Sequence, residues 1–246
     1  MYYTDTHIHL QDYNPADIKN IVTNAQKNNI RAFVNVSAHP DDWDAVLELA
    51  DAYPQIIPAL GVHPWYIDEA PVNWQQRLEQ QLRNNPAVCL GECGIDRLKN
   101  TDTAKQLTIL HRHIELAQTY SRPLIIHAVK ADEILRPVLP LLPEKTVFHS
   151  FTGSAEWGLE LQKHGFYLGF NFSILRKKNY DKMLQRLNPH LFLLETDGPY
   201  QSGQKEIPSL PQNLPELAAK LATACGLSVA EFAEIICRNW HFFKGE

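Results

Sequence analysis

The feature that most constrains the fold is a series of eight short apolar segments that alternate with segments of helical character. Their hydrophobicity is nearly continuous rather than alternating, which is typical of strands buried on both faces. The predicted strands span residues 2–6, 31–36, 56–61, 87–92, 123–127, 146–149, 166–170 and 191–195. Helices are predicted over residues 15–28, 41–52, 102–120, 154–164 and 177–187.

Strands and helices that alternate through short connections imply a parallel sheet. Eight such units within 246 residues predict the α/β class and a (β/α)8 TIM barrel, with residues 1–246 forming a single domain. A doubly wound open sheet is the alternative, but no G-x-G-x-x-G follows the first strand. The barrel is therefore the preferred prediction.

Composition narrows the classes of function. The net charge of −5 argues against a protein that coats duplex nucleic acid over a broad basic face. No run of about 18 apolar residues is present, so no membrane span is predicted. The four cysteines form no C-x-x-C pair, and the first residues do not resemble a secretory signal. We therefore expect a cytoplasmic protein with reduced thiols, and no obligate protein partner is implied.

Histidines and carboxylates recur where the predicted strands end. In a (β/α)8 barrel these strand ends build the active site. The first strand leads into "HIH", in which two imidazoles one residue apart share one face. The full set after the first, third, fourth, fifth, sixth and eighth strands is His7, His9, His63, Glu92, His127, His149 and Asp197. Five imidazoles and two carboxylates at one end of a barrel predict a divalent metal site.

Other side chains at the same strand ends suit supporting roles. Asp96 is a candidate to orient a ligand histidine through its second ring nitrogen, and Glu195 is expected to support the site. Cys93 is expected to turn away from it. Basic residues at this rim, Arg97, Lys99, Lys130 and Arg176, suit the capture of a phosphodiester end.

Six blocks of this sequence together resemble the TatD family of metal-dependent hydrolases and deoxyribonucleases, within the larger group of amidohydrolase-like barrels. The blocks are "DTHIHL", "GVHPW", "LGECGID", "PLIIHA", "VFHSFTGS" and "ETDGPY", in the family's order. The resemblance covers nearly the whole chain. It implies two divalent metal ions per chain and cleavage of phosphodiester bonds at the ends of single-stranded DNA.

The resemblance also implies roles for the residues at the strand ends. One ion would be held by His7, His9, Glu92 and Asp197, and the other by Glu92, His127 and His149, so that Glu92 bridges. Imidazole and carboxylate ligands without sulfur suit Zn, Mn, Ni or Fe, and Mg less well. Asp197 is the expected base for the attacking water, and His63 the expected hydrogen-bond donor to the scissile phosphate. Glu92 is thus counted among the catalytic residues, with Asp197 and His63.

The sequence departs from the family outside the ligand blocks. After the fifth strand the family usually carries a serine–arginine pair, whereas this chain has Ala128, Val129 and Lys130. Lys130 is expected to replace that arginine as a point charge, with Arg97 and Arg176 as further substrate-binding residues. Two alternatives remain open. The same metal core could hydrolyse a small phosphoester, a lactone or a cyclic amide, or the chain could be a non-catalytic binding barrel.

Overall fold

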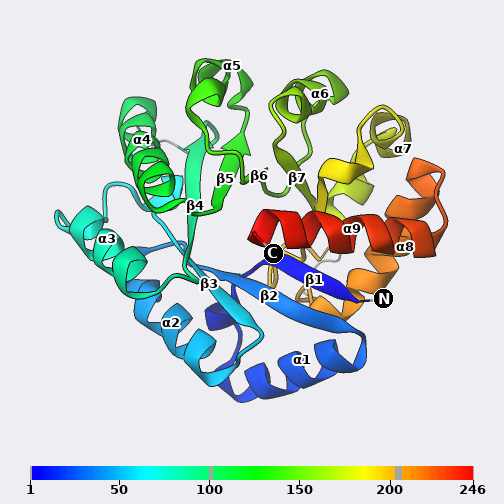
Figure 1. Cartoon of the computed structure of the whole chain (residues 1–246), viewed down its shortest axis with the longest axis horizontal. Helices are drawn as coiled ribbons and strands as arrows, with labels where there is room; N and C mark the ends of the chain where they lie inside the picture. Colours follow the sequence, from blue (N-terminus) through cyan, green and yellow to red (C-terminus); the bar gives the residue numbers. More distant parts are fainter. Residues whose placement is uncertain (1, 100–101, 203–206, 246) are drawn as a thin grey trace. The chain divides into compact units, whose positions relative to one another are not determined.

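The computed structural model describes residues 2–99, 102–202 and 207–245. Within these residues the strands form one eight-stranded sheet, ordered as they occur in the chain. The strands are β1 (Tyr3–Ile8), β2 (Ile30–Val36), β3 (Ile56–Leu60), β4 (Cys89–Asp96), β5 (Leu124–Val129), β6 (Thr146–Phe148), β7 (Tyr167–Phe170) and β8 (Phe192–Leu194). Their order and their alternation with helices confirm the predicted (β/α)8 class (Figure 1).

The α-helices of the described residues lie between or after the strands. They are α1 (Pro15–Lys27), α2 (Trp43–Ala52), α3 (Trp74–Asn84), α4 (Thr103–Tyr120), α5 (Asp132–Leu135), α6 (Ala155–Lys163), α7 (Tyr180–Leu184), α8 (Leu214–Cys225) and α9 (Val229–Lys244). Short 3-10 turns are η1 (Leu10–Asp12), η2 (Pro40–Asp42), η3 (Pro64–Tyr66), η4 (Arg136–Leu141), η5 (Phe172–Arg176), η6 (Pro189–Leu191) and η7 (Pro211–Asn213).

The chain divides into two compact units, of which the second comprises Asn35–His149. In this unit β3 pairs with β4, β4 with β5, and β5 with β6, all in parallel. The register between β4 and β5 shifts between Leu90 and Cys93, after which Gly94 lies opposite His127. This irregularity interrupts the alternation of side chains along β4 at the position of Glu92.

Hydrogen bonds connect helix α4 to the end of β4 and to the segment that follows β3. The Gln106 side chain accepts a hydrogen bond from the Asp96 amide (2.9 Å) and donates one to the Asp96 carbonyl (3.1 Å). On the same helix the buried His113 accepts from the Val62 amide at 3.3 Å. His113 thus has a structural role, because its contact with Val62 fixes the backbone next to His63.

The first unit comprises Met1–Val34 and Ser150–Glu246. Strands β7 and β8 pair in parallel, and β1 meets the segment after β8 through a bridge between Ile8 and Gly198. Helix α8 (orange) and helix α9 (red) lie next to each other in Figure 1. Ser228 begins α9 with a capping box, and the apolar face of this helix buries Phe232 and Trp240. This packing covers β1 and β8, from which one group of site residues emerges.

Several predicted bounds need correction. Strand β1 runs to Ile8, so His7 belongs to the strand itself, and β4 continues past Glu92 to Asp96. The helix predicted over residues 177–187 is reduced to α7, which begins only at Tyr180 because Asn179 adopts a left-handed conformation with φ 57°. Helices α3, α5, α8 and α9 fall outside the ranges predicted from the sequence.

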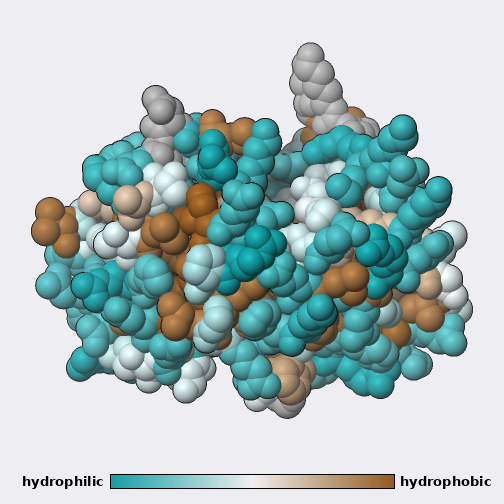
Figure 2. All heavy atoms as spheres, turned by 90° about the horizontal axis from the view of Figure 1, so that it is seen from above, coloured by the Kyte–Doolittle hydropathy of each residue, from teal (hydrophilic) through white to brown (hydrophobic). Residues whose placement is uncertain are grey.

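The surface is dominated by polar residues on the face that Figure 2 shows, with smaller groups of hydrophobic residues between them. Among the described helices, none combines the length and apolar character needed to cross a bilayer.

Candidate metal centre

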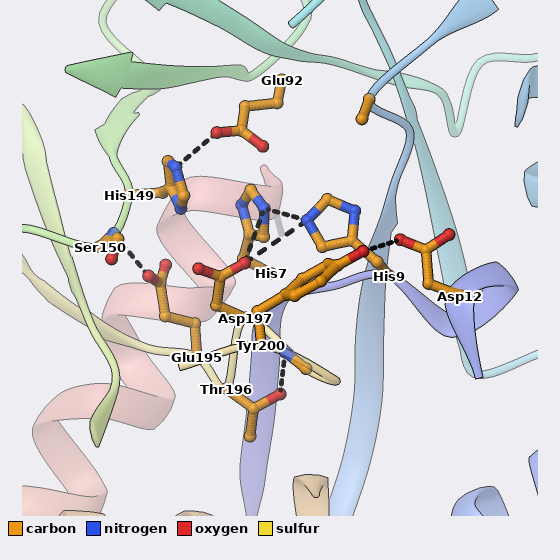
Figure 3. Close-up of polar contacts among 12 residues, drawn as sticks. His7, His9, Asp12, Glu92, His149, Ser150, Glu195, Thr196, Asp197 and Tyr200 are labelled. Atoms are coloured by element: carbon orange, nitrogen blue, oxygen red, sulfur yellow. Dashed lines mark hydrogen bonds and ion pairs between the residues drawn. The ribbon is translucent and has the colours of Figure 1, made fainter. Parts of the chain in front are cut away.

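The first unit brings His7, His9 and Asp197 together, as Figure 3 shows. His7 Nε2 lies 3.2 Å from His9 Nε2, and these two atoms lie 3.8 and 3.4 Å from Asp197 Oδ1. All three residues are buried. Two imidazole nitrogens and one carboxylate oxygen that point at one place are suitable ligands for a divalent cation.

Backbone hydrogen bonds hold the two segments that carry this group. The Asp197 amide donates to the His7 carbonyl at 2.9 Å, and the His9 amide donates to the Gly198 carbonyl at 2.8 Å. Asp197 itself has φ 55°, a left-handed conformation that is rare for a residue with a side chain. The turn after β8 is thus shaped to aim the Asp197 carboxylate at the imidazoles of the β1 segment.

Asp5 is a site residue that sequence reasoning missed. Its fully buried carboxylate accepts from the Thr196 amide (2.9 Å), the Thr196 hydroxyl (2.5 Å) and the His7 amide (3.3 Å). Burial raises the pKa of Asp5 to about 7, against the lowering effect of these hydrogen bonds. Asp5 therefore ties β1 to the residue that precedes Asp197. The alternation of Asp5 with His7 and His9 along "DTHIH" was the available signal.

Glu195 has the supporting role expected from the sequence. Its buried carboxylate accepts from the Ser150 amide at 2.6 Å and from the Asn171 side-chain amide at 3.3 Å. Asn171 also donates to the Ser150 hydroxyl at 3.0 Å. Glu195 thereby anchors the segment that follows β6, and Asn171 is a second supporting residue that the sequence analysis missed.

The second unit brings Glu92, His127 and His149 together. The Oε1 atom of Glu92 lies 2.6 Å from Nδ1 of His127 and 2.6 Å from Nε2 of His149. The two imidazole nitrogens are 3.2 Å apart. Figure 3 shows the contact between Glu92 and His149. Two imidazoles that face one carboxylate oxygen are again a set of donors suited to a divalent cation.

His63 lies beside this second group, with its Nε2 atom 3.5 Å from Glu92 Oε1 and 3.3 Å from His127 Nδ1. By distance alone, His63, Glu92 and His127 could share an ion. However, Nδ1 of His63 accepts a hydrogen bond from the Trp65 amide at 3.1 Å. Burial lowers the pKa of His63 and favours the neutral ring, although Glu92 opposes this effect. In a neutral ring with this contact, the proton sits on Nε2, the nitrogen that faces Glu92.

Asp96 lies behind His127, on the side opposite to Glu92. Its Oδ2 atom is 3.4 Å from His127 Nε2 and accepts from Trp65 Nε1 at 2.6 Å, while Oδ1 accepts from the Leu98 amide at 2.8 Å. Burial raises the pKa of Asp96, but these hydrogen bonds outweigh it, so the pKa lies below its usual range. An ionised Asp96 is placed to accept the proton of His127 Nε2, which directs Nδ1 of the same ring towards Glu92.

The basic residues expected to bind substrate are all exposed. Arg97 and Lys130 follow the ends of the paired strands β4 and β5, and the Arg97 amide donates to the Val129 carbonyl at 3.1 Å. Arg176 lies in the other unit, where its guanidinium donates to the Gln201 side chain at 2.7 Å. Cys93 is turned into the protein and donates to the Ile125 carbonyl at 3.8 Å, as expected.

The chain is similar to known proteins in sequence and in structure. The profile of the family described as TatD related DNase matches residues 4–243. Human Deoxyribonuclease TATDN3 is 28% identical over 257 residues, which cover 96% of this chain and 92% of that protein. The 3'-5' ssDNA/RNA exonuclease TatD of Edwardsiella piscicida is 30% identical over 222 residues, covering 84% of this chain and 85% of that protein. The crystal structure of YJJV, a TatD homolog from Escherichia coli K12, matches with a TM-score of 0.91 at 25% identity, covering 98% of this chain and 97% of that one.

Proposed function

The chain belongs to the family of TatD-related DNases, which are metal-dependent hydrolases of ester bonds, and we propose that it removes nucleotides from the ends of single-stranded DNA. The observation that carries this proposal is the pair of ligand groups, His7–His9–Asp197 and Glu92–His127–His149, each with donor atoms within 3.8 Å of one another. The name of the Edwardsiella relative supports single-stranded nucleic acid as the substrate.

The ligand groups fit two divalent ions. One ion would be held by His7, His9, Asp197 and Glu92, and the other by His127, His149 and the same Glu92. The donors are imidazole nitrogens and carboxylate oxygens without sulfur, which suits Zn, Mn, Ni or Fe, and Mg less well. When bound, the ions would neutralise charge on the phosphate and lower the pKa of the attacking water.

The residues of the chain supply proton transfer and orientation in this reaction. Asp197 is the proposed base, since its carboxylate would accept the proton of the attacking water. His63 is the proposed donor to a non-bridging oxygen of the scissile phosphate. The hydrogen bond from the Trp65 amide to Nδ1 supports this role, because it keeps the proton of His63 on Nε2. The cations of Arg97, Lys130 and Arg176 would hold further phosphates of the strand.

The proposal that Glu92 is a ligand of both ions can be tested by measuring the metal content of variants. Glu92→Ala should lose more metal than His7→Ala or His127→Ala, because it removes a ligand from both ions at once. Metal content is measured by elemental analysis after gel filtration, with Glu115→Ala as a control, since Glu115 lies exposed on α4 and pairs with Arg112. Equal metal retention in Glu92→Ala and the wild type would contradict the bridging role.

A substrate panel tests the proposed activity. The metal-loaded protein is assayed on single-stranded DNA, RNA, dinucleotides, small phosphoesters, lactones and cyclic amides. We expect the highest kcat/KM on single-stranded DNA, with loss of activity on chelation and recovery when the metal is restored. Preference for a small phosphoester, lactone or amide would replace the nuclease by the alternative hydrolase. Bound metal without turnover of any substrate would favour a binding barrel.

A further inference from the structure

An exposed tryptophan stands next to the proposed phosphate donor. Trp65 is the second residue after His63, in the short turn η3, and 43% of it is exposed. Exposed apolar side chains are common in proteins, so exposure alone has no functional meaning. The surroundings of Trp65 are what distinguish it.

The indole ring of Trp65 is held in a defined orientation. Its Nε1–H donates to Asp96 Oδ2 at 2.6 Å, and its ring packs at right angles to the His63 ring, with centroids 5.0 Å apart. Because two contacts fix the ring before any ligand arrives, little side-chain entropy remains to be lost on binding. Trp65 is therefore a preorganised flat surface beside His63.

A positive charge accompanies this surface. The Lys99 ammonium lies 4.2 Å from the centroid of the Trp65 ring. In the part of the chain that the structure describes, Lys99 forms no ion pair with a carboxylate. Its charge is therefore available to an anion next to the ring.

We propose that Trp65 is the surface on which a nucleobase neighbouring the scissile phosphate stacks, and that Lys99 binds an adjacent phosphate. The inference rests on the proposed nuclease function and adds a binding subsite to it. Proteins that hold single strands without sequence preference combine aromatic side chains, on which bases stack, with cations along the backbone. Trp65 and Lys99 supply both components, and the shared turn connects the subsite to His63.

The test compares Trp65→Ala, Trp65→Phe and wild type on two metal-saturated substrates. One is a short single-stranded oligonucleotide, and the other is the same strand with abasic sites next to the cleaved bond. Trp65→Ala should raise KM for the normal strand by about 5- to 150-fold relative to Trp65→Phe, the range expected for one stacked base. Both variants lose the hydrogen bond to Asp96, so any change in kcat should be the same in the two. On the abasic strand its KM should equal that of the wild type. Trp65→Phe keeps an aromatic face and should retain most of the affinity, although it loses the bond to Asp96.

The controls separate stacking from structural support. Leu98→Ala removes an exposed apolar side chain close to Lys99 and should leave both KM values unchanged. An equal loss on normal and abasic strands, or equal damage from Trp65→Phe and Trp65→Ala, would overturn the stacking role. So would an unchanged KM in Trp65→Ala. If the wild type neither cleaves nor binds oligonucleotides, the proposed nuclease function is wrong, and the proposed subsite is then wrong as well.

Discussion

The surroundings of His127 and His63 favour the same tautomer, with the proton on Nε2, but the two rings turn different nitrogens towards Glu92. His127 has Asp96 at Nε2, which leaves Nδ1 to face Glu92, whereas His63 has its Nδ1 occupied by the Trp65 amide. Trp65 serves both residues, since its backbone contacts His63 and its indole contacts Asp96. One residue of the η3 turn thus helps to set the protonation of two imidazoles.

Asp96→Asn should weaken metal binding by about 10- to 100-fold, which is the usual cost of losing a residue that orients a metal ligand. Both Asp96 oxygens accept hydrogen bonds, from Leu98 on one side and from Trp65 and His127 on the other. An asparagine amide group would meet a donor on one of these sides. The measurement is metal affinity by competition with a chelating dye. Asp68→Asn, at an exposed residue paired with Lys105, is the control, and equal affinities in the two variants would contradict the role.

At the residue scale, the candidate metal ligands can be predicted from the sequence more readily than the residues that hold them in place. The ligand candidates share a position, the end of an apolar strand, and such positions are visible in the pattern of residues. Asp5 is different, because its partner Thr196 is 191 residues away in the chain. The tautomer of His63 likewise depends on a backbone amide whose position only the fold reveals.

At the scale of elements, β4 is the irregular strand on which the second ligand group depends. Its register with β5 shifts between Leu90 and Cys93, and Gly94 has φ 147°. A side chain at Gly94 would collide with the carbonyl oxygen of His127. Glycine therefore allows the close approach of β4 to β5, which brings Glu92 and His127 into contact.

Gly94→Ala should destabilise the protein by about 2–4 kcal/mol, the sum of overpacking and a positive φ. Gly165→Ala is a matched control, because Gly165 also has a positive φ but would place its Cβ in open space. It should cost only about 1 kcal/mol. Urea denaturation of the metal-free proteins measures both values. Equal destabilisation would show that strand spacing is not the constraint at Gly94.

The succession of elements was predictable because a strand buried on both faces leaves a nearly continuous apolar segment. The register shift in β4 was not, since "LGECGI" reads as an ordinary buried strand. Helix α7 begins later than predicted because Asn179 adopts a left-handed conformation that its neighbours do not indicate. The pattern of apolar residues thus predicts the order of the strands and helices, whereas the ends of these elements depend on the backbone conformation of single residues.

At the scale of the whole molecule, a net charge of −5 must be reconciled with a polyanionic substrate. Long-range attraction by net charge is excluded, so binding has to rely on a few local cations. The ends of β4 and β5 are followed by Arg97 and Lys130, and η5 ends at Arg176. A protein of this kind should neutralise few phosphates, as expected for an enzyme that holds only the end of a strand.

The triple variant Arg97→Ala, Lys130→Ala, Arg176→Ala should raise KM for single-stranded DNA while metal content stays unchanged. A long strand should be affected more than a dinucleotide, because it presents more phosphates. For the wild type, the logarithm of the binding constant should fall with the logarithm of salt concentration. The slope should be about −1 to −3, given about −0.7 per neutralised phosphate and about two to four contacts. The triple variant should show a slope closer to zero.

A second triple variant separates local contacts from total charge. Lys27, Lys145 and Lys163 precede β2, β6 and β7, at the strand ends away from the proposed site. Replacing all three by alanine changes the net charge by the same amount, from −5 to −8, since three positive charges are removed from the wild-type value. If binding depends on local cations, this control keeps the wild-type slope and KM. If both triple variants weaken binding equally, Arg97, Lys130 and Arg176 act only through net charge. A flat salt response of the wild type would instead favour a small substrate on the same metal core.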